Sequence, residues 1–155
     1  MKTLTTIFAA LILLTSCIKH DVTPVKSSGN YGSWTYGANT FKGDYSSWSS
    51  VILVSTADKP HASALEAVFT STSPNSGNYS VVPLGDVTGS NQVSINVVDS
   101  SLPAIEYSSL DGDSGTVSVS RSGSSVTVTV TNVKLKGVTS DLKQDSIVVT
   151  GTIVK

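Results

Sequence analysis

Alternation of apolar and hydroxyl side chains is the feature that most limits what this chain can fold into. Over residues 116–130, valine occupies every second position in two stretches, with serine or threonine between the valines. Successive side chains of a strand point to opposite faces, so this period produces one apolar face and one hydroxyl face. Valine and threonine are also β-branched and suit a pleated surface better than a helix. The pattern therefore predicts β-strands.

The same period runs through residues 31–155 and is interrupted by Gly, Pro, Asn, Asp or Ser every eight to twelve residues. Residues 62–68 are the one arguable helix, and we interpret them as a loop followed by a strand. The sequence predicts an all-β domain, an antiparallel β-sandwich or flattened barrel of about eight to ten strands. The expected strands are 32–36, 40–46, 50–56, 65–71, 78–82, 92–98, 104–108, 115–121, 125–135 and 146–154.

One hairpin can be predicted to its register. A two-residue turn at Ser122-Gly123 would place Val119 opposite Val126 and keep all valines on one face. The apolar parity then changes after Val130, which predicts a β-bulge near Thr131-Asn132. The strand at 146–154 is apolar on both faces in part, so we expect it to be central in a sheet or well covered, and not a bare edge.

The first thirty residues have a different character. Lys2 precedes an apolar run over residues 4–14, which is too short for a spanning helix of about 20 residues and suits a secretion signal. The Leu14-Thr15-Ser16-Cys17 segment that follows resembles the bacterial lipobox. This resemblance implies that residues 1–16 are a lipoprotein signal peptide and that Cys17, the only cysteine, is lipidated. Residues 17–30 then form a flexible tether.

The lipobox resemblance also has implications for location. In lipoproteins of this type an aspartate after the cysteine resembles an inner-membrane retention signal, and this chain has Ile18 there. We therefore expect lipid anchoring in the outer membrane. In lipoproteins that resemble those of Bacteroidota, surface display is associated with a small cluster of acidic residues just after the cysteine. Here only Asp21 is present, so the sequence does not decide between the two faces of the membrane.

Strand and turn motifs in the β-domain carry a second resemblance. Gly77-Asn78-Tyr79, Val126-Thr127-Val128 and Thr150-Gly151-Thr152-Ile153 are similar to segments of the small all-β lipoproteins of Bacteroidota that are classed as domains of unknown function. The resemblance implies a fold and a location. It implies no activity.

Residues suited to catalysis are few. His20 and His61 are the only histidines, and we expect His61 to be a solvated loop residue and not part of a serine–histidine–aspartate triad. Glu66 and Glu106 are the only glutamates, and nothing local fixes them relative to one another, so we expect two outward-facing strand residues. The segment 111–115 lacks the further ligands of a calcium loop. We predict no enzyme, no cofactor and no metal site.

Aromatic residues gather near the start of the domain. Exposed Trp34, Tyr36 and Trp48 would suit stacking against a glycan, although the same rings could fill one end of the core. Gly32-Ser33-Trp34 also resembles the start of lipocalins, which would imply a calycin-like carrier of apolar ligands. A formal net charge of −1 excludes a strongly basic nucleic-acid binder. We expect a lipid-anchored envelope protein with a structural or binding role toward a glycan or an envelope protein.

Overall fold

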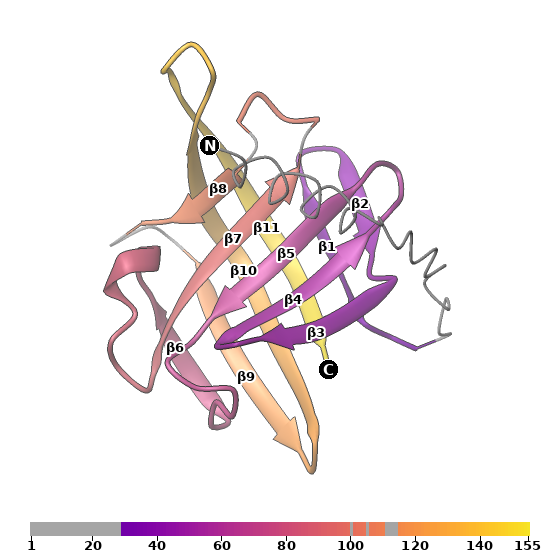
Figure 1. Ribbon diagram of the computed structural model, residues 1–155, viewed down its shortest axis with the longest axis vertical. Coiled ribbons are helices and arrows are strands. Elements are labelled where there is room, and N and C mark those ends of the chain that lie inside the picture. The colour runs from indigo at the N-terminus through magenta and orange to yellow at the C-terminus, as the bar shows by residue number, and fades with distance from the viewer. Residues whose placement is uncertain (1–28, 100, 105, 111–114) are drawn as a thin grey trace, which may run out of the picture.

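The computed structural model describes residues 29–99, 101–104, 106–110 and 115–155 (Figure 1). The predicted signal peptide and most of the tether lie outside these ranges. The described residues form eleven strands, one more than the upper bound expected from the sequence, and no α-helix. The strands are β1 (Gly32–Tyr36), β2 (Asn39–Lys42), β3 (Tyr45–Ser49), β4 (Ile52–Ala57), β5 (Ser63–Val68), β6 (Gly77–Val81), β7 (Gln92–Asp99), β8 (Glu106–Ser109), β9 (Thr116–Ser122), β10 (Ser125–Val138) and β11 (Gln144–Val154).

All eleven strands belong to one curled sheet. Ten follow the order β2-β1-β11-β10-β9-β6-β7-β5-β4-β3, and β8 pairs with both β7 and β10. The strands β6 to β10 therefore close a partial ring, from which β11-β1-β2 and β5-β4-β3 extend as two wings. Because the wings end in separate edge strands, the fold is not a regular barrel. The pairs are antiparallel except for a short parallel contact between β6 and β7.

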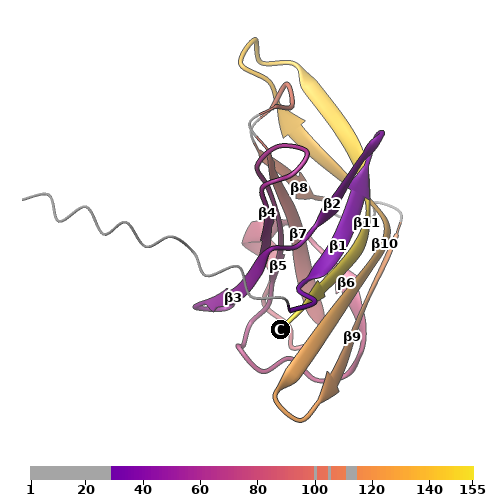
Figure 2. The same ribbon diagram turned by 90° about the vertical axis from the view of Figure 1, so that its right-hand side faces the viewer.

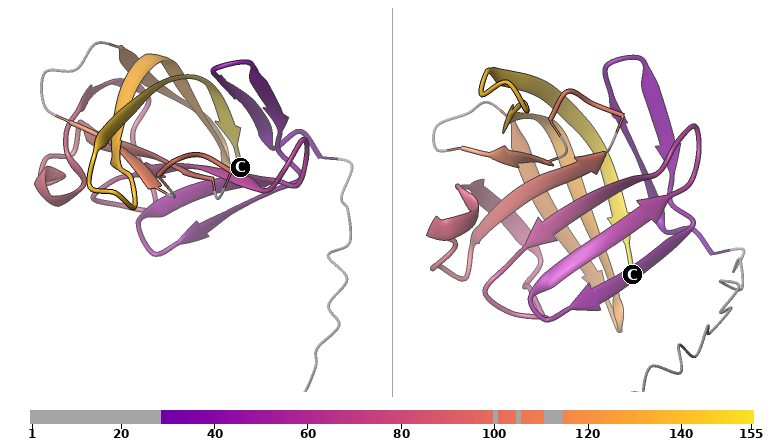
Figure 3. Two further views of the ribbon diagram at one scale, coloured as in Figure 1. Left: turned by 90° about the horizontal axis from the view of Figure 1, so that it is seen from above. Right: turned by 45° about the horizontal axis from the view of Figure 1, so that its top comes forward.

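The curled sheet folds over itself into two layers. In Figure 1, β3, β4, β5 and β7 cross obliquely in front of β9, β10 and β11, and the view from above in Figure 3 shows the two layers enclosing a common interior. In each layer, every second side chain along a strand points to the interior, and these positions hold the valines, leucines and isoleucines. The largest fully buried side chains are Trp34, Phe41, Leu53, Leu65, Ile95, Tyr107, Leu135 and Ile153. The predicted sandwich-like all-β class is confirmed.

The two wings come together where β3 approaches the C-terminal end of β11 (Figure 2). The Ser46 hydroxyl on β3 donates to the Val154 carbonyl on β11 at 2.5 Å, and the Lys155 ammonium donates to the Ser46 carbonyl at 3.1 Å. The Ser55 hydroxyl on β4 donates to the Tyr31 carbonyl at 2.9 Å, just before β1. These cross-layer bonds close the open side of the sandwich.

The predicted strand over residues 40–46 is two strands. The chain leaves one layer after β2 and enters the other at β3, turning at Gly43 and Asp44. A Cβ at Gly43 would lie 2.5 Å from the Ser55 hydroxyl oxygen, so a side chain at this position would displace that hydroxyl, which bonds to the Tyr31 carbonyl. A strand-to-strand change of layer leaves no break in the apolar period, which is why the sequence pattern missed it.

The β9–β10 hairpin keeps the predicted faces but not the predicted turn. Val119 lies opposite Val128, two residues further along than expected, and the two-residue turn is Gly123-Ser124. Gly123 has a φ of 60°, as the first central residue of a tight hairpin turn requires. Valine opposes valine in either register, so alternation alone could not distinguish them. The predicted bulge is confirmed between Val130 and Val133, as is the central position of β11 between β1 and β10.

Candidate functional site

The aromatic residues singled out for glycan stacking lie mostly inside the fold. Trp34 is 1% exposed and Tyr36 is 2% exposed. Both rings stack on Phe41, with centroids 5.5 Å and 4.9 Å away, respectively. Trp48 packs at the border of the core beside Phe69, with centroids 6.1 Å apart. A sugar needs an open ring face, and neither Trp34 nor Tyr36 presents one.

Tyr36 instead uses its hydroxyl to hold a buried carboxylate. Its hydroxyl donates to Asp99 at the end of β7 and lies 3.0 Å from the Ser63 hydroxyl on β5. The Asp99 side chain is fully buried. This contact ties one layer to the other, since Tyr36 belongs to β1 and Asp99 to β7.

His61 completes this cluster. It lies in a loop, as predicted, but its side chain is only 30% exposed and has hydrogen-bond partners, so it is not freely solvated. Its Nε2 lies 2.6 Å from an Asp99 oxygen and 2.8 Å from the Ser101 hydroxyl. The Ser101 backbone N–H donates to the other Asp99 oxygen at 2.7 Å. The imidazole also packs edge-on against Phe41 at 5.2 Å. We call Tyr36, His61, Ser63, Asp99 and Ser101 the Asp99 cluster.

The hydrogen bonds determine the charge state of the buried carboxyl. Burial by itself raises the pKa of Asp99, but the hydrogen bonds from Tyr36, Ser101 and His61 together outweigh it. The pKa of Asp99 therefore lies below its ordinary value, and the group is a carboxylate at neutral pH. Burial, followed by the bond to Asp99, raises the pKa of Tyr36, which keeps the phenol protonated as a donor.

The Asp99 cluster contains serine, histidine and aspartate without the geometry of a catalytic triad. A triad needs the carboxylate on one ring nitrogen and the serine hydroxyl on the other, so that the base can pass a proton between them. Here Asp99 and Ser101 both approach Nε2. The carboxylate is also shared with Tyr36. The hydrogen bonds of the cluster join the ends of β1 and β7 to the start of β5.

A second group of polar side chains lies on the outer face of the sheet. Strand pairing places Glu66, Asn96, Ser108 and Lys136 in register across β5, β7, β8 and β10. We call these four residues the polar row. Glu106, two positions before Ser108 on β8, lies on the same face. The structure therefore places on one face two glutamates that the sequence could not relate to each other.

Glu66 is half-buried within this row. Burial raises its pKa, a hydrogen bond with Asn96 lowers it, and the charge of Glu106 raises it again, with a net upward direction. Asn96 is 2% exposed. The charge of Glu106 on the same face thus contributes to the raised pKa of Glu66.

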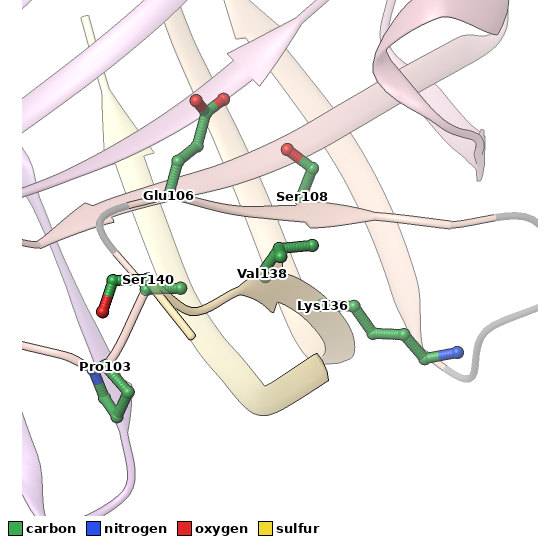
Figure 4. A pocket seen from close by; sticks show the side chains of 8 residues that line it. Pro103, Glu106, Ser108, Lys136, Val138 and Ser140 are labelled. Atoms are coloured by element: carbon green, nitrogen blue, oxygen red, sulfur yellow. The ribbon is translucent and has the colours of Figure 1, made fainter. Parts of the chain in front are cut away.

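A surface hollow of about 520 Å³ opens at the end of the polar row (Figure 4). Its labelled lining residues are Pro103, Glu106, Ser108, Lys136, Val138 and Ser140. Glu106 and Ser108 leave β8 on the same side, and Lys136 extends from the neighbouring strand β10. None of the four polar side chains forms a hydrogen bond or ion pair with another residue in the described ranges. We call this feature the Glu106–Lys136 hollow.

The close approach of β8 and β10 forms the floor of this hollow. A Cβ at Gly137 would lie 2.7 Å from the Glu106 carbonyl oxygen and 2.8 Å from the Ala104 Cβ. Glycine at this position therefore lets the two strands pair side by side. Beneath the floor, the Tyr107 hydroxyl donates to Asp145 at 2.5 Å, which fixes β8 against β11.

The other features considered from the sequence are the calcium-like segment, the lipidation site, metal sites and membrane-spanning helices. Residues 111–114 of the considered calcium segment lie outside the described residues, as does Cys17. Across the ranges that the structure covers, no cluster of three or more His, Cys, Asp or Glu side chains could hold a metal ion. In the same ranges, no helix has the length and apolar character needed to cross a membrane.

Comparisons with protein-family models, with curated proteins and with solved structures found no match to this chain. The findings identify a small all-β protein with a large mixed sheet.

Proposed function

We propose that this protein is a lipid-anchored, non-enzymatic domain of the bacterial outer membrane that acts by binding. The anchoring is supported by the sequence, in which Lys2, the apolar run at residues 4–14 and Leu14-Thr15-Ser16-Cys17 occur in the order that a lipoprotein signal uses. Two or more acyl chains on one cysteine would hold the domain stably at a membrane surface.

The observation that carries the non-enzymatic role is the geometry of the Asp99 cluster. It is the grouping of described residues that comes nearest to a nucleophile with a base, and its histidine offers the same nitrogen to both Asp99 and Ser101. Ser101 therefore has no separate base to accept its proton while Asp99 orients the ring.

Binding is supported by the surface and not by the interior. The space between the layers is filled by rings and branched side chains that are 0–2% exposed, among them Trp34, Phe41 and Tyr107. This filling disfavours the calycin-like carrier, because a carrier needs an apolar cavity between its sheets. The Glu106–Lys136 hollow, in contrast, presents polar groups that no described residue engages.

Cys17→Ala tests the anchor. The variant is expected to leave the membrane fraction, because no acyl chain can be attached, and to keep the unfolding midpoint of the β-domain. Fractionation of cells, with immunoblotting and labelling by a radioactive fatty acid, measures the change. Ser27→Ala, another small-residue change in the tether, is the control and should stay in the membrane fraction. A Cys17→Ala protein that resists extraction from membranes would refute the lipid assignment.

A fluorophosphonate probe tests the non-enzymatic role. Such probes label serines that a neighbouring base has activated, and we expect no labelling of the folded full chain above the level of the heat-unfolded chain. Gel fluorescence measures the label, and a serine hydrolase in the same sample serves as the positive control. Labelling that disappears in Ser101→Ala would show an activated nucleophile and overturn this part of the proposal.

A further inference from the structure

We propose that the Glu106–Lys136 hollow binds a neutral saccharide unit, with the polar row as its extension. This inference rests on the proposed binding function and names the site and ligand class for it. The site differs from the aromatic set Trp34, Tyr36 and Trp48, which the sequence favoured.

The hollow has the size and rigidity of a small-molecule site. Its volume of about 520 Å³ falls within the usual range for ligand pockets, roughly 300–1,000 Å³. Glu106 and Ser108 stand on β8, and Lys136 stands on β10. β8 is paired on both sides, with β7 and β10. Side chains on paired strands are held in position better than side chains on loops, so little ordering is needed when a ligand binds.

The charges of the hollow favour a neutral ligand. Among the described residues that line it, Glu106 carries the one carboxylate and Lys136 the one ammonium, and these two groups do not pair with each other. The carboxylate would repel an anionic ligand and the ammonium would repel a cationic ligand. A neutral polyol is repelled by neither group. The carboxylate can accept hydrogen bonds from two neighbouring sugar hydroxyls, and the ammonium can donate to a hydroxyl or ring oxygen.

The remaining lining groups fit the other properties of a sugar. The Ser108 and Ser140 hydroxyls can both donate and accept, as sugar hydroxyls do. Val138 and Pro103 offer apolar surface to the C–H groups of the ring. The described part of the lining includes no aromatic side chain, so we expect weak binding, with a Kd of about 1 mM for one site.

The polar row gives the site a direction. Asn96 and Glu66 follow Ser108 strand by strand, and neighbouring strands lie about 4.8 Å apart. A chain of two or three sugar units could lie along the row, with one unit in the hollow and a further unit reaching the half-buried Glu66. Longer oligosaccharides are therefore expected to bind more tightly than monosaccharides.

The test uses the full chain, purified in detergent, and defined trisaccharides. Cellotriose, maltotriose and mannotriose are the neutral probes, trigalacturonic acid is the anionic probe and triglucosamine is the cationic probe. Calorimetry measures affinity, and NMR chemical shifts locate the contact. Glu106→Ala and Lys136→Met each remove one charged group of the hollow. Lys134→Met is the matched control, because Lys134 lies two residues earlier on the same face of β10 outside the hollow.

We expect at least one neutral trisaccharide to bind, to shift the amide signals of Glu106 and Ser108, and to lose affinity about tenfold in Glu106→Ala and in Lys136→Met, a change of about 1.4 kcal/mol. Lys134→Met should bind as the unchanged chain does. The inference is overturned if no neutral probe binds at concentrations near 10 mM, roughly ten times the expected Kd. It is also overturned if a charged probe binds more tightly, or if both hollow variants bind normally. Such results would leave the membrane and probe-labelling tests of the proposed function unaffected.

Discussion

Asp99→Ala is expected to lower the free energy of unfolding by about 3 kcal/mol, because it leaves buried hydrogen-bond donors without their acceptor. The change removes the acceptor of the Tyr36 hydroxyl, of the Ser101 backbone N–H and of the His61 imidazole together. Chemical denaturation followed by far-ultraviolet circular dichroism measures the loss. Asp141→Ala, which removes an exposed carboxylate paired with Lys143, is the control and should leave the unfolding midpoint unchanged.

The same carboxylate gives the stability a defined dependence on pH. Since the pKa of Asp99 is lower in the folded chain than its ordinary value of 3.8, its contribution is complete above that pH and is lost as the pH falls through the lowered folded value. The free energy of unfolding should therefore fall steeply below about pH 4 and less steeply in Asp99→Ala. Parallel acid dependence in the two proteins would contradict the stabilising role given to the carboxylate.

Gly151→Ala is expected to cost about 2–3 kcal/mol through overpacking. Gly151 on β11 lies opposite Trp34 on β1, and a Cβ there would approach the Ser33 carbonyl oxygen to 2.4 Å and the Trp34 Cα to 2.5 Å. These neighbours are backbone atoms held by strand pairing, so they cannot move aside without disturbing the β1–β11 ladder. Thermal and chemical unfolding measure the cost.

Gly85→Ala is the matched control for this crowding effect. A Cβ at Gly85 has no atom within 4 Å, and the residue lies in a short 3-10 turn at Leu84–Asp86. Its stability should change by no more than about 0.5 kcal/mol. If the two substitutions changed the stability equally, crowding of a Cβ against Trp34 could not be the reason that position 151 needs glycine.

The sequence predicted where strands lie and which of their side chains face inward, because both depend on residues that are neighbours in the chain. Strand β1 begins and ends where the alternation predicted, and the bulge after Val130 follows from the parity change between Val130 and Val133. Parity also contained an unused signal for the Asp99 cluster. Val93, Ile95 and Val97 face inward, so Asp99 falls on the inward side, where a carboxylate needs hydrogen-bond donors.

Pairing between distant strands was not readable in this way. The partners of β8 on both sides and the parallel contact of β6 with β7 depend on how the whole sheet curls. The strands are short and similar in their Val, Ser and Thr content, so the local sequence does not favour one order of pairing over another. The Glu106–Lys136 hollow arises from such a pairing, since its charged residues belong to β8 and β10, about thirty residues apart in a sheet whose strand order the period does not specify.

The place of β1 in the sheet has a consequence for the order of assembly. β9, β10 and β11 are joined by short connections, and can pair early because closing a short loop costs little entropy. In contrast, the Ser33–Thr152 contact between β1 and β11 spans 119 residues of chain. The β9–β10–β11 meander is thus the natural nucleus, and β1 docks onto its free side late. Substitutions in β1 such as those near Trp34 should therefore act mainly on the unfolding rate, while those in the meander slow folding itself.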